Sequence, residues 1–440
     1  MLSQIKTYTY PNGEIQRVQC VKLDRWEELH FAALSYEDPA FEGFCNIYRR
    51  YLLPTCPWIF GQMVMFRLPE DVEVPLVYES SKYGAVADRL TAAAMLLEKG
   101  VKIRFGKPRF SDENAKKLYL ALEKQGCLQI VSGKLPTTQV IAVGSLPGYL
   151  THTQEARLKI NAHFFIMDPI DCATVFDHVG MPIGLSVKDG VVSNPPLYGR
   201  EALLVKKDGS VTVKPLDLTD LTLEIGGVAV DGTVYARPKA MRTPNDKRKK
   251  LVIVGDRVVA VKQQGSACVP ASGVVVAVAD CTAKPGDRVV YRGLEDVTFG
   301  VQIGNSILRN GEKTKEFLSK FYNVRRLEPV PYPPSLYPMD FENARAARTA
   351  IGADGDGKPM LLWAEGKGKL RYQAGEDSCG ASLPEMAEIC ADLGMVNAVN
   401  MDGGGSAQIL LHGRRQLMIC DRNPDNTEAE RAIPFALIVK

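Results

Sequence analysis

Near its C-terminal end the chain reads Asn400-Met401-Asp402-Gly403-Gly404-Gly405-Ser406. An apolar run of β type, residues 396–399, precedes this stretch, and a second run, residues 407–411, follows it. Three consecutive glycines cost much backbone entropy on folding, so a chain keeps them where the backbone takes positive φ or where a ligand approaches the peptide groups. The carboxylate, the bare N–H groups and the hydroxyl suit a phosphate or sugar site. They fit a glycine-rich β-turn equally well, and the stretch alone leaves both interpretations open.

The overall composition predicts a globular protein without a strong field of either sign. The 440 residues are enough for about two or three domains, and 45% of them are hydrophobic, which is ample for buried cores. Lysine and arginine number 54 against 51 aspartates and glutamates, a net charge of +3. This balance attracts neither nucleic acid nor membrane surfaces, so we expect no nucleic-acid partner. The basic cluster at residues 247–250 is interpreted as a solvated turn.

The cellular compartment and the cofactors are predicted from what the sequence lacks. The first eight residues contain no apolar segment of a secretory signal, and no run approaches the ~18–20 apolar residues of a membrane span. We therefore expect a cytoplasmic protein without a membrane span. The ten cysteines are scattered, without a C-x-x-C pair and without histidines at zinc spacing. They predict reduced thiols, and we expect no metal ion and no other cofactor. Nothing in the sequence indicates the oligomeric state.

Residues 1–145 predict a small accessory α/β domain of unknown role. Helices are expected over 26–34, 88–99 and 115–124, since each has a helical apolar pattern and the last two end at a glycine. Short β-type runs such as 101–105 lie between them. This part of the chain contains no chemical motif.

Residues 150–440 predict a separate domain of mostly strands. Hairpins are expected at 184–192, 203–213 and 251–261, where Asp-Gly or Gly-Asp turns join alternating runs, and we interpret them as parts of one large sheet. The proline-rich segment 329–334 is a loop or linker.

One helix is predicted in this domain, over residues 383–393. Ser382 would be its N-cap and Glu385 its third residue, which together make a capping box. The predicted fold class is therefore α+β: a large mixed, mostly antiparallel sheet with few packed helices, plus the small N-terminal α/β domain.

Several polar residues at strand ends are candidates for a site, although each alone has an ordinary structural explanation. Asn161 and His163 alternate with apolar residues and share one face of a predicted strand, where a half-buried strand is the simpler interpretation. Arg348 and Thr349 begin another strand, and an arginine suits bidentate phosphate binding. Glu365 ends a third strand just before a glycine, as many turn residues do.

Taken in order, these pieces resemble the phosphodiester glycosidase family. The resemblance is carried by Arg348-Thr349-Ala350-Ile351-Gly352, Ala364-Glu365-Gly366, the helix from Leu383 to Glu388 and the stretch Val396 to Ser406; upstream, Asn161-Ala162-His163-Phe164-Phe165 is similar to the family's Asn-Gly-x-Phe/Tyr-Phe motif. It covers about residues 155–440 and is strongest over 348–412. Two departures stand out: Ala162 replaces the usual glycine, and Glu365 stands where aspartate is common.

The resemblance implies a hydrolase that cleaves the bond between the anomeric carbon of a sugar and a phosphate, with a small or polymeric phospho-sugar as substrate. It implies Asp402 as nucleophile or general base, Glu365 as second carboxylate and Glu385 as a third candidate besides its capping role. The implied substrate-binding residues are those that would hold the phosphate, Arg348 with the N–H groups of Gly403, Gly404 and Gly405, and those that would hold sugar or phosphate oxygens, Asn161, His163, Thr349 and Ser406.

Two other functions compete with this interpretation. A phosphodiesterase that attacks phosphorus with two metal ions needs several Asp and His ligands, and the chain has five histidines and no H-x-D motif. A non-catalytic carbohydrate or phospho-sugar binding protein would keep the same pocket without turnover.

Overall fold

The computed structural model describes residues 1–33, 156–165, 181–237, 239–314, 343–368, 372–422, 425–428, 430–431, 433 and 435–440, and three short strands elsewhere. The chain divides into two compact units. The first contains Met1–Ala32, Leu150–Phe164 and Pro182–Lys440, and the second contains Ala33–Tyr149 and Phe165–Met181. Strands paired almost throughout in antiparallel fashion dominate the described residues, with one α-helix among them, so the predicted α+β class is confirmed.

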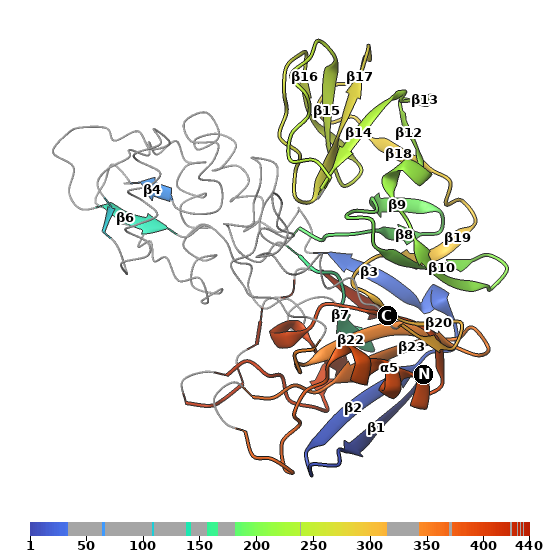
Figure 1. Ribbon diagram of the computed structural model, residues 1–440, viewed down its shortest axis with the longest axis vertical. Helices are drawn as coiled ribbons and strands as arrows, with labels where there is room; N and C mark the ends of the chain where they lie inside the picture. The colour runs from blue at the N-terminus through green and yellow to red at the C-terminus, as the bar shows by residue number, and fades with distance from the viewer. Residues whose placement is uncertain are drawn as a thin grey trace. The chain divides into compact units, whose positions relative to one another are not determined.

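The largest sheet among the described residues of the first unit has seven antiparallel strands, in the order β1-β2-β23-β22-β24-β20-β21 (Figure 1). Its strands are β1 (Leu2–Thr9), β2 (Ile15–Lys22), β20 (Ser306–Arg309), β21 (Glu312–Lys313), β22 (Arg348–Asp354), β23 (Pro359–Ala364) and β24 (Met395–Asn400). Every residue of β22 and β23 is buried, including the polar Arg348, Thr349 and Asp354 of β22, so neither strand alternates between a buried and an exposed face.

The N-terminal hairpin β1–β2 belongs to this sheet. β2 pairs with β23 from Val18 opposite Ala364 to Lys22 opposite Met360, and Figure 1 shows the blue hairpin beside the orange strands. The predicted boundary near 145–150 had assigned residues 1–32 to the N-terminal domain, and the structure differs there. The physical reason is that Val18 and Cys20 complete the core over the edge of β23, which would otherwise present unpaired backbone groups.

The helix predicted over 26–34 is wrong. The structure has a single 3-10 turn, Trp26–Glu28, followed by strand β3 (Leu29–Ala33). Tertiary contacts override the local pattern, because Trp26 and Phe31 both stack on the ring of Phe299, with centroids 5.2 and 5.4 Å away.

The three predicted hairpins form, but they do not share one sheet. The first two, β8–β9 (Ser186–Lys188, Val191–Asn194) and β10–β11 (Glu201–Lys206, Val211–Pro215), join β19 (Val297–Val301) in a five-stranded sheet. The third, β15–β16 (Lys249–Val254, Arg257–Lys262), pairs with β17 (Gly273–Val278) and β14 (Gly232–Ala236) in a separate four-stranded sheet. The third hairpin lies in a separate sheet because β15 pairs with β17. This fully buried strand is not part of any of the three predicted hairpins.

Two further sheets lie in the described part of this unit. A three-stranded sheet has the order β13-β12-β18, with β12 at Thr222–Ile225, β13 at Val228–Ala229 and β18 at Val289–Arg292. A five-stranded sheet has the order β26-β25-β7-β27-β3, with β7 at Leu158–Asn161, β25 at Ile409–Leu411, β26 at Arg414–Arg415 and β27 at Phe435–Val439.

The predicted C-terminal helix is confirmed as α5 (Leu383–Asp392). Ser382 caps it, with the N–H of Glu385 3.3 Å from the Ser382 hydroxyl and the N–H of Ser382 2.8 Å from the Glu385 carboxylate. Met386 and Ile389 pack with residues of β2, β22 and β23 in one core. None of the helices in the described ranges has the length and apolarity needed to cross a bilayer.

Only three strands of the second unit are described. They are β4 (Val64–Phe66), β5 (Pro108–Arg109) and β6 (Thr138–Ile141), with β6 antiparallel to β4 and parallel to β5. The helices predicted over 88–99 and 115–124, the strand at 101–105 and the proline-rich segment 329–334 lie outside the described residues. The accessory α/β domain is therefore still a prediction.

Candidate functional site

The register of the seven-stranded sheet brings the predicted motifs together where β22 begins and where β23 and β24 end. Arg348, the first residue of β22, lies opposite Ala364, the last residue of β23. Asn400, the last residue of β24, lies opposite Ala350. Because β22 is antiparallel to both neighbours, its first residue lies beside the last residues of β23 and β24. The segments that carry Glu365 and Asp402 therefore leave the sheet on either side of β22.

Two glycines permit this close approach around Ala347. A Cβ atom on Gly366 would lie 2.5 Å from the Cβ of Ala347, and a Cβ atom on Gly403 would lie 2.7 Å from its carbonyl oxygen. Both distances are below ordinary contact, so any larger residue would push the two loops away from β22. Glycine is needed here for space between backbones.

Asn161 and Thr349 hold the backbone of Asp402 from two different sheets. The carbonyl oxygen of Asp402 accepts hydrogen bonds from Asn161 Nδ2 and from Thr349 Oγ1, both at 2.6 Å. Asn161 Nδ2 also donates to Thr349 Oγ1 at 3.1 Å, and its Oδ1 accepts from the Gln408 N–H at 3.1 Å. Both side chains are fully buried. Asn161 and Thr349 therefore meet at the main chain of Asp402, and their hydrogen bonds position the turn.

Ala162, the departure from the family motif, fits this arrangement without strain. Its carbonyl oxygen accepts the Asp402 N–H at 3.0 Å, and its own N–H donates to Phe435 at 3.2 Å. Ala162 is absent from the positive-φ residues of the described chain, so no glycine is required there.

The carboxyl group of Asp402 is buried with one oxygen left over. Oδ1 accepts the N–H of Gly403 at 2.9 Å, whereas Oδ2 is enclosed and has no hydrogen-bond partner among the described residues. Burial raises the pKa of Asp402 to about 6, against the opposing effects of the Ser406 hydroxyl, Arg431 and the Gly403 N–H. A carboxyl group with a pKa near neutrality and a spare oxygen is typical of acid–base or nucleophilic chemistry.

The three glycines after Asp402 serve different purposes. The N–H of Gly403 bonds the Asp402 side chain, and the N–H of Gly404 donates to Ala347 at 2.8 Å. Gly404 also takes a φ of +60°, in the left-handed region. A Cβ atom on Gly405 would overlap the carboxylate of Asp421.

An ion pair next to Gly405 was not found from the sequence. Arg431 Nη2 lies 3.0 Å from Asp421 Oδ2, and Arg431 Nη1 donates to the hydroxyl of Ser406 at 3.5 Å. Neither residue belongs to a motif, so no local signal could have identified them. The positive charge of Arg431 opposes the rise in the pKa of Asp402.

Glu365 joins three segments of the chain. Its Oε2 accepts from Ser378 Oγ at 2.5 Å and from Arg17 Nη1 at 3.1 Å, and its Oε1 accepts the Met418 N–H at 2.8 Å. Arg17 lies on β2 and is 348 residues away in sequence, which is why sequence reasoning missed it. Glu365 is therefore a charged group whose position is fixed by three donors.

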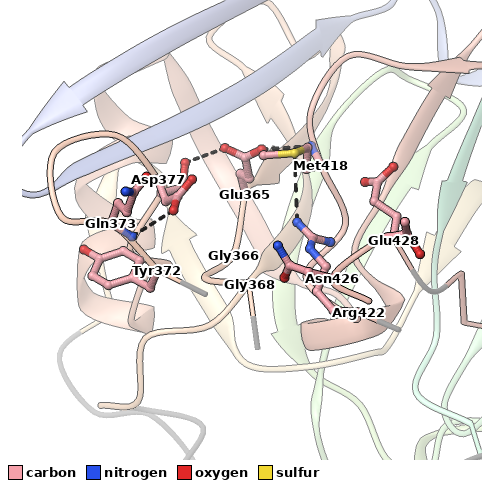
Figure 2. Close-up of a pocket in the computed structure, with 12 residues that line it drawn as sticks. Glu365, Gly366, Gly368, Tyr372, Gln373, Asp377, Met418, Arg422, Asn426 and Glu428 are labelled. Atoms are coloured by element: carbon pink, nitrogen blue, oxygen red, sulfur yellow. Dashed lines mark hydrogen bonds between the residues drawn. The ribbon is translucent and has the colours of Figure 1, made fainter. Parts of the chain in front are cut away.

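A cavity of about 830 Å³ opens at Glu365 (Figure 2). Its described lining consists of Glu365, Gly366, Gly368, Tyr372, Gln373, Asp377, Ser378, Met418, Arg422, Asn426, Thr427 and Glu428. Figure 2 shows Tyr372, Gln373 and Asp377 on one side and Met418, Arg422 and Glu428 on the other. This volume is typical of small-molecule sites. Of the candidates from the sequence, Glu365 is the one that belongs to this described lining.

The remaining candidates make structural contacts. Arg348 is buried, and its guanidinium donates to the carbonyl oxygens of Ala381 at 3.0 Å and Ala344 at 2.8 Å. Glu385 accepts from Ser382 in the capping box, and its Oε1 lies 2.6 Å from Arg345 Nη2.

His163 is a buried, neutral side chain at neutral pH. Its Nε2 lies 2.8 Å from the carbonyl oxygen of Leu185, and its ring meets Phe435 edge-on with centroids 4.8 Å apart. Burial lowers the pKa of His163 to about 4. Its contacts are those of a core residue.

The fold and the site define a class: a mainly antiparallel β protein with a buried acid on a glycine turn and a polar cavity at Glu365. Residues 226–440 match the family model described as phosphodiester glycosidase. This part of the chain is a phosphodiester glycosidase domain, and the family predicted from the motifs is confirmed.

Curated relatives agree with this family over a short stretch. The mouse and human proteins named N-acetylglucosamine-1-phosphodiester alpha-N-acetylglucosaminidase are 40% and 41% identical to this chain over 86 residues. The match covers 20% of this chain and spans 15% of the length of each relative.

Solved structures resemble the chain only distantly. A hypothetical protein from Synechocystis aligns with 99% of this chain and 61% of its own at 16% identity and a TM-score of 0.42. The catalytic domain of the zebrafish N-acetylglucosamine-1-phosphodiester alpha-N-acetylglucosaminidase aligns over 66% of each chain at 16% identity and a TM-score of 0.32.

Proposed function

We propose that this protein hydrolyses the glycosidic bond of a sugar-1-phosphodiester, such as a diester of N-acetylglucosamine 1-phosphate. The family match over residues 226–440 and the names of the partial relatives support this class of substrate. The observation that carries the proposal is the Asp402 carboxyl group, which is buried, has a spare oxygen and has a pKa raised to about 6.

In this reaction the bond between the anomeric carbon and the phosphate oxygen breaks, and the phosphate monoester leaves with the electron pair. Because such a leaving group is already stable as an anion, it needs little help from a general acid. Asp402 acts on the anomeric carbon, either directly as nucleophile or by taking a proton from the water that attacks it. The water oxygen ends on the sugar. Both roles require ionised Asp402, which predominates above pH about 6.

The neighbouring residues would support this chemistry in distinct ways. Asn161 and Thr349 fix the main chain of Asp402, so that its carboxyl group keeps one orientation. Glu365, which lines the cavity, supplies a second carboxylate whose negative charge would stabilise an oxocarbenium-like centre.

The competing function is a phospho-sugar binding protein without turnover. It is favoured by one observation: both carboxylate oxygens of Glu365 already accept hydrogen bonds within the protein. Such a protein would bind the ligand and release no sugar.

The test is incubation of the purified chain with a panel of sugar-1-phosphodiesters in ¹⁸O-labelled water. We expect release of one sugar with the label on its anomeric oxygen. Label in the phosphate would show attack on phosphorus and contradict the proposal. Binding without any release would support the competing function. The variant Asp402→Asn serves as the matched control, because it keeps the shape of the side chain and removes its charge.

A further inference from the structure

Arg422 is the one cation among the described residues that line the cavity. Its Nη1 donates to the carbonyl oxygens of Ile419 and, at 3.1 Å, of Asp421. Its Nη2 faces only the sulfur of Met418 at 4.0 Å, as Figure 2 shows. A thioether is a weak acceptor. Nε and Nη2, the two donors on one edge of the guanidinium, therefore have no oxygen acceptor in the described part of the chain.

The charges around the cavity are arranged unevenly. Glu365 pairs with Arg17 at 3.1 Å, and Glu428 pairs with Arg415 at 3.4 Å. Arg422 has no carboxylate within ion-pair distance among the residues the structure describes. Two of the three lining carboxylates thus pair with cations from outside the cavity, whereas the lining arginine has no carboxylate partner in the part of the chain that the structure describes.

We propose that Arg422 binds the phosphate of the substrate through its Nε–Nη2 edge. This inference rests on the proposed function for the identity of the ligand. An arginine edge with two parallel N–H groups fits two oxygens of a phosphate, and the bonds to Ile419 and Asp421 hold the plane of the guanidinium in place.

The opposite side of the cavity suits the sugar. Asp377 and Gln373 offer acceptors and donors for hydroxyl groups there. The ligand would therefore lie across the cavity, with its phosphate toward Arg422. Arg348, the arginine that the sequence nominated, is buried and donates to the carbonyl oxygens of Ala344 and Ala381. The proposed phosphate-binding residue, Arg422, thus lies outside every motif found in the sequence.

The kinetic test compares two substrates of the same sugar, a phosphodiester and an uncharged 4-nitrophenyl glycoside. For Arg422→Gln we expect the KM for the phosphodiester to rise about 10- to 100-fold, the usual effect of losing a charged hydrogen bond, with KM for the glycoside within about 2-fold. Arg422→Lys should recover part of the loss, because it restores the charge without the fork. The control Arg414→Gln removes an exposed arginine outside the described lining and should match the wild type for both substrates.

A binding measurement separates failure of this inference from failure of the proposed function. Calorimetry with N-acetylglucosamine 1-phosphate and with N-acetylglucosamine is run on the wild type, Arg422→Gln and Arg414→Gln. Binding of the phosphate that Arg422→Gln alone loses supports the inference, even in a protein that shows no turnover. Equal affinity of wild type and Arg422→Gln for the phosphate overturns it, even in an active enzyme. A parallel fall in thermal stability and in affinity for the unphosphorylated sugar would assign Arg422 a structural role and overturn it as well.

Discussion

At the scale of single residues, burial of Asp402 disfavours its ionised form and at the same time gives it a pKa suited to catalysis. Its carboxyl group is buried, so the ionised form is disfavoured and the pKa rises from near 3.8 to about 6. Its main chain is nevertheless held by Asn161 and Thr349, which do not depend on its charge. The protein therefore tolerates an unfavourable charge at this position because the surrounding bonds determine where it lies.

The first prediction concerns activity. Asp402→Asn should lower kcat by at least about 100-fold, as expected for a lost base or nucleophile. In the wild type, kcat/KM should fall as the pH drops below about 6, because protonation of Asp402 removes the reactive form. Steady-state kinetics across pH 4–9 with a phosphodiester substrate measures both effects. A variant with wild-type turnover, or a profile flat through pH 6, would remove Asp402 from the chemistry.

The second prediction concerns stability. The folded protein binds the Asp402 proton more tightly than the unfolded chain, so this group stabilises the fold at low pH and loses that contribution as pH rises from about 3.8 to about 6. The free energy of unfolding of Asp402→Asn, relative to that of the wild type, should therefore rise by on the order of 1–3 kcal/mol between pH 4 and pH 7. Denaturant unfolding at the two pH values measures this difference. A difference between variant and wild type that does not change with pH would contradict the raised pKa.

At the scale of elements, α5 shows which structural features can be predicted from neighbouring residues alone. The Ser382–Glu385 capping box formed as predicted, because both partners lie within one turn and need no distant contact. The helix predicted over 26–34 failed, because the rings of Trp26 and Phe31 pack on Phe299 from another strand. Local rules hold where an element satisfies its own backbone groups, and they fail where a distant surface determines the conformation.

The third prediction uses this capping box to test Glu385. Ser382→Ala and Glu385→Ala should each lower the free energy of unfolding by about 0.5–2 kcal/mol, the usual effect of losing an N-cap interaction. If Glu385 acts only as a cap, kcat per folded molecule should be the same in both variants. Chemical denaturation and kinetics on matched protein samples give the two quantities. Loss of kcat in Glu385→Ala alone would restore this residue as a third catalytic carboxylate.

At the scale of the whole molecule, the two ends of the sequence build one sheet. The hairpin β1–β2 pairs with β23, and its Arg17 reaches Glu365 at the cavity. Residues 1–32 are therefore part of the domain that carries the candidate site. The family match, which begins at residue 226, does not include them.

The fourth prediction follows from this pairing. If the chain is cut at a protease site introduced near residue 145, the N-terminal fragment should stay bound to residues 150–440, because separation would expose the edge of β23 and the core around Val18. Size-exclusion chromatography followed by mass spectrometry detects both fragments in one peak. The fragments should separate only in denaturant. Two folded fragments that elute apart in buffer would show that residues 1–32 are dispensable for the domain.

The family was predicted from the order of the motifs along the chain. The sequence also predicted a strand that begins at Arg348, a strand that ends at Glu365, an apolar β run over residues 396–399, the cap of α5 and the glycine turn after Asp402. These features rest on alternation, capping and turn chemistry between residues that are close in the chain. The tertiary structure alone decided that the N-terminal hairpin joins the sheet, that Arg17 binds Glu365, that Arg431 lies beside Ser406 and that Arg422 lines the cavity. It also decided the protonation of Asp402, since burial results from packing of several distant segments around one carboxyl group. No local pattern encodes contacts such as that of Arg17 with Glu365, whose partners are 348 residues apart.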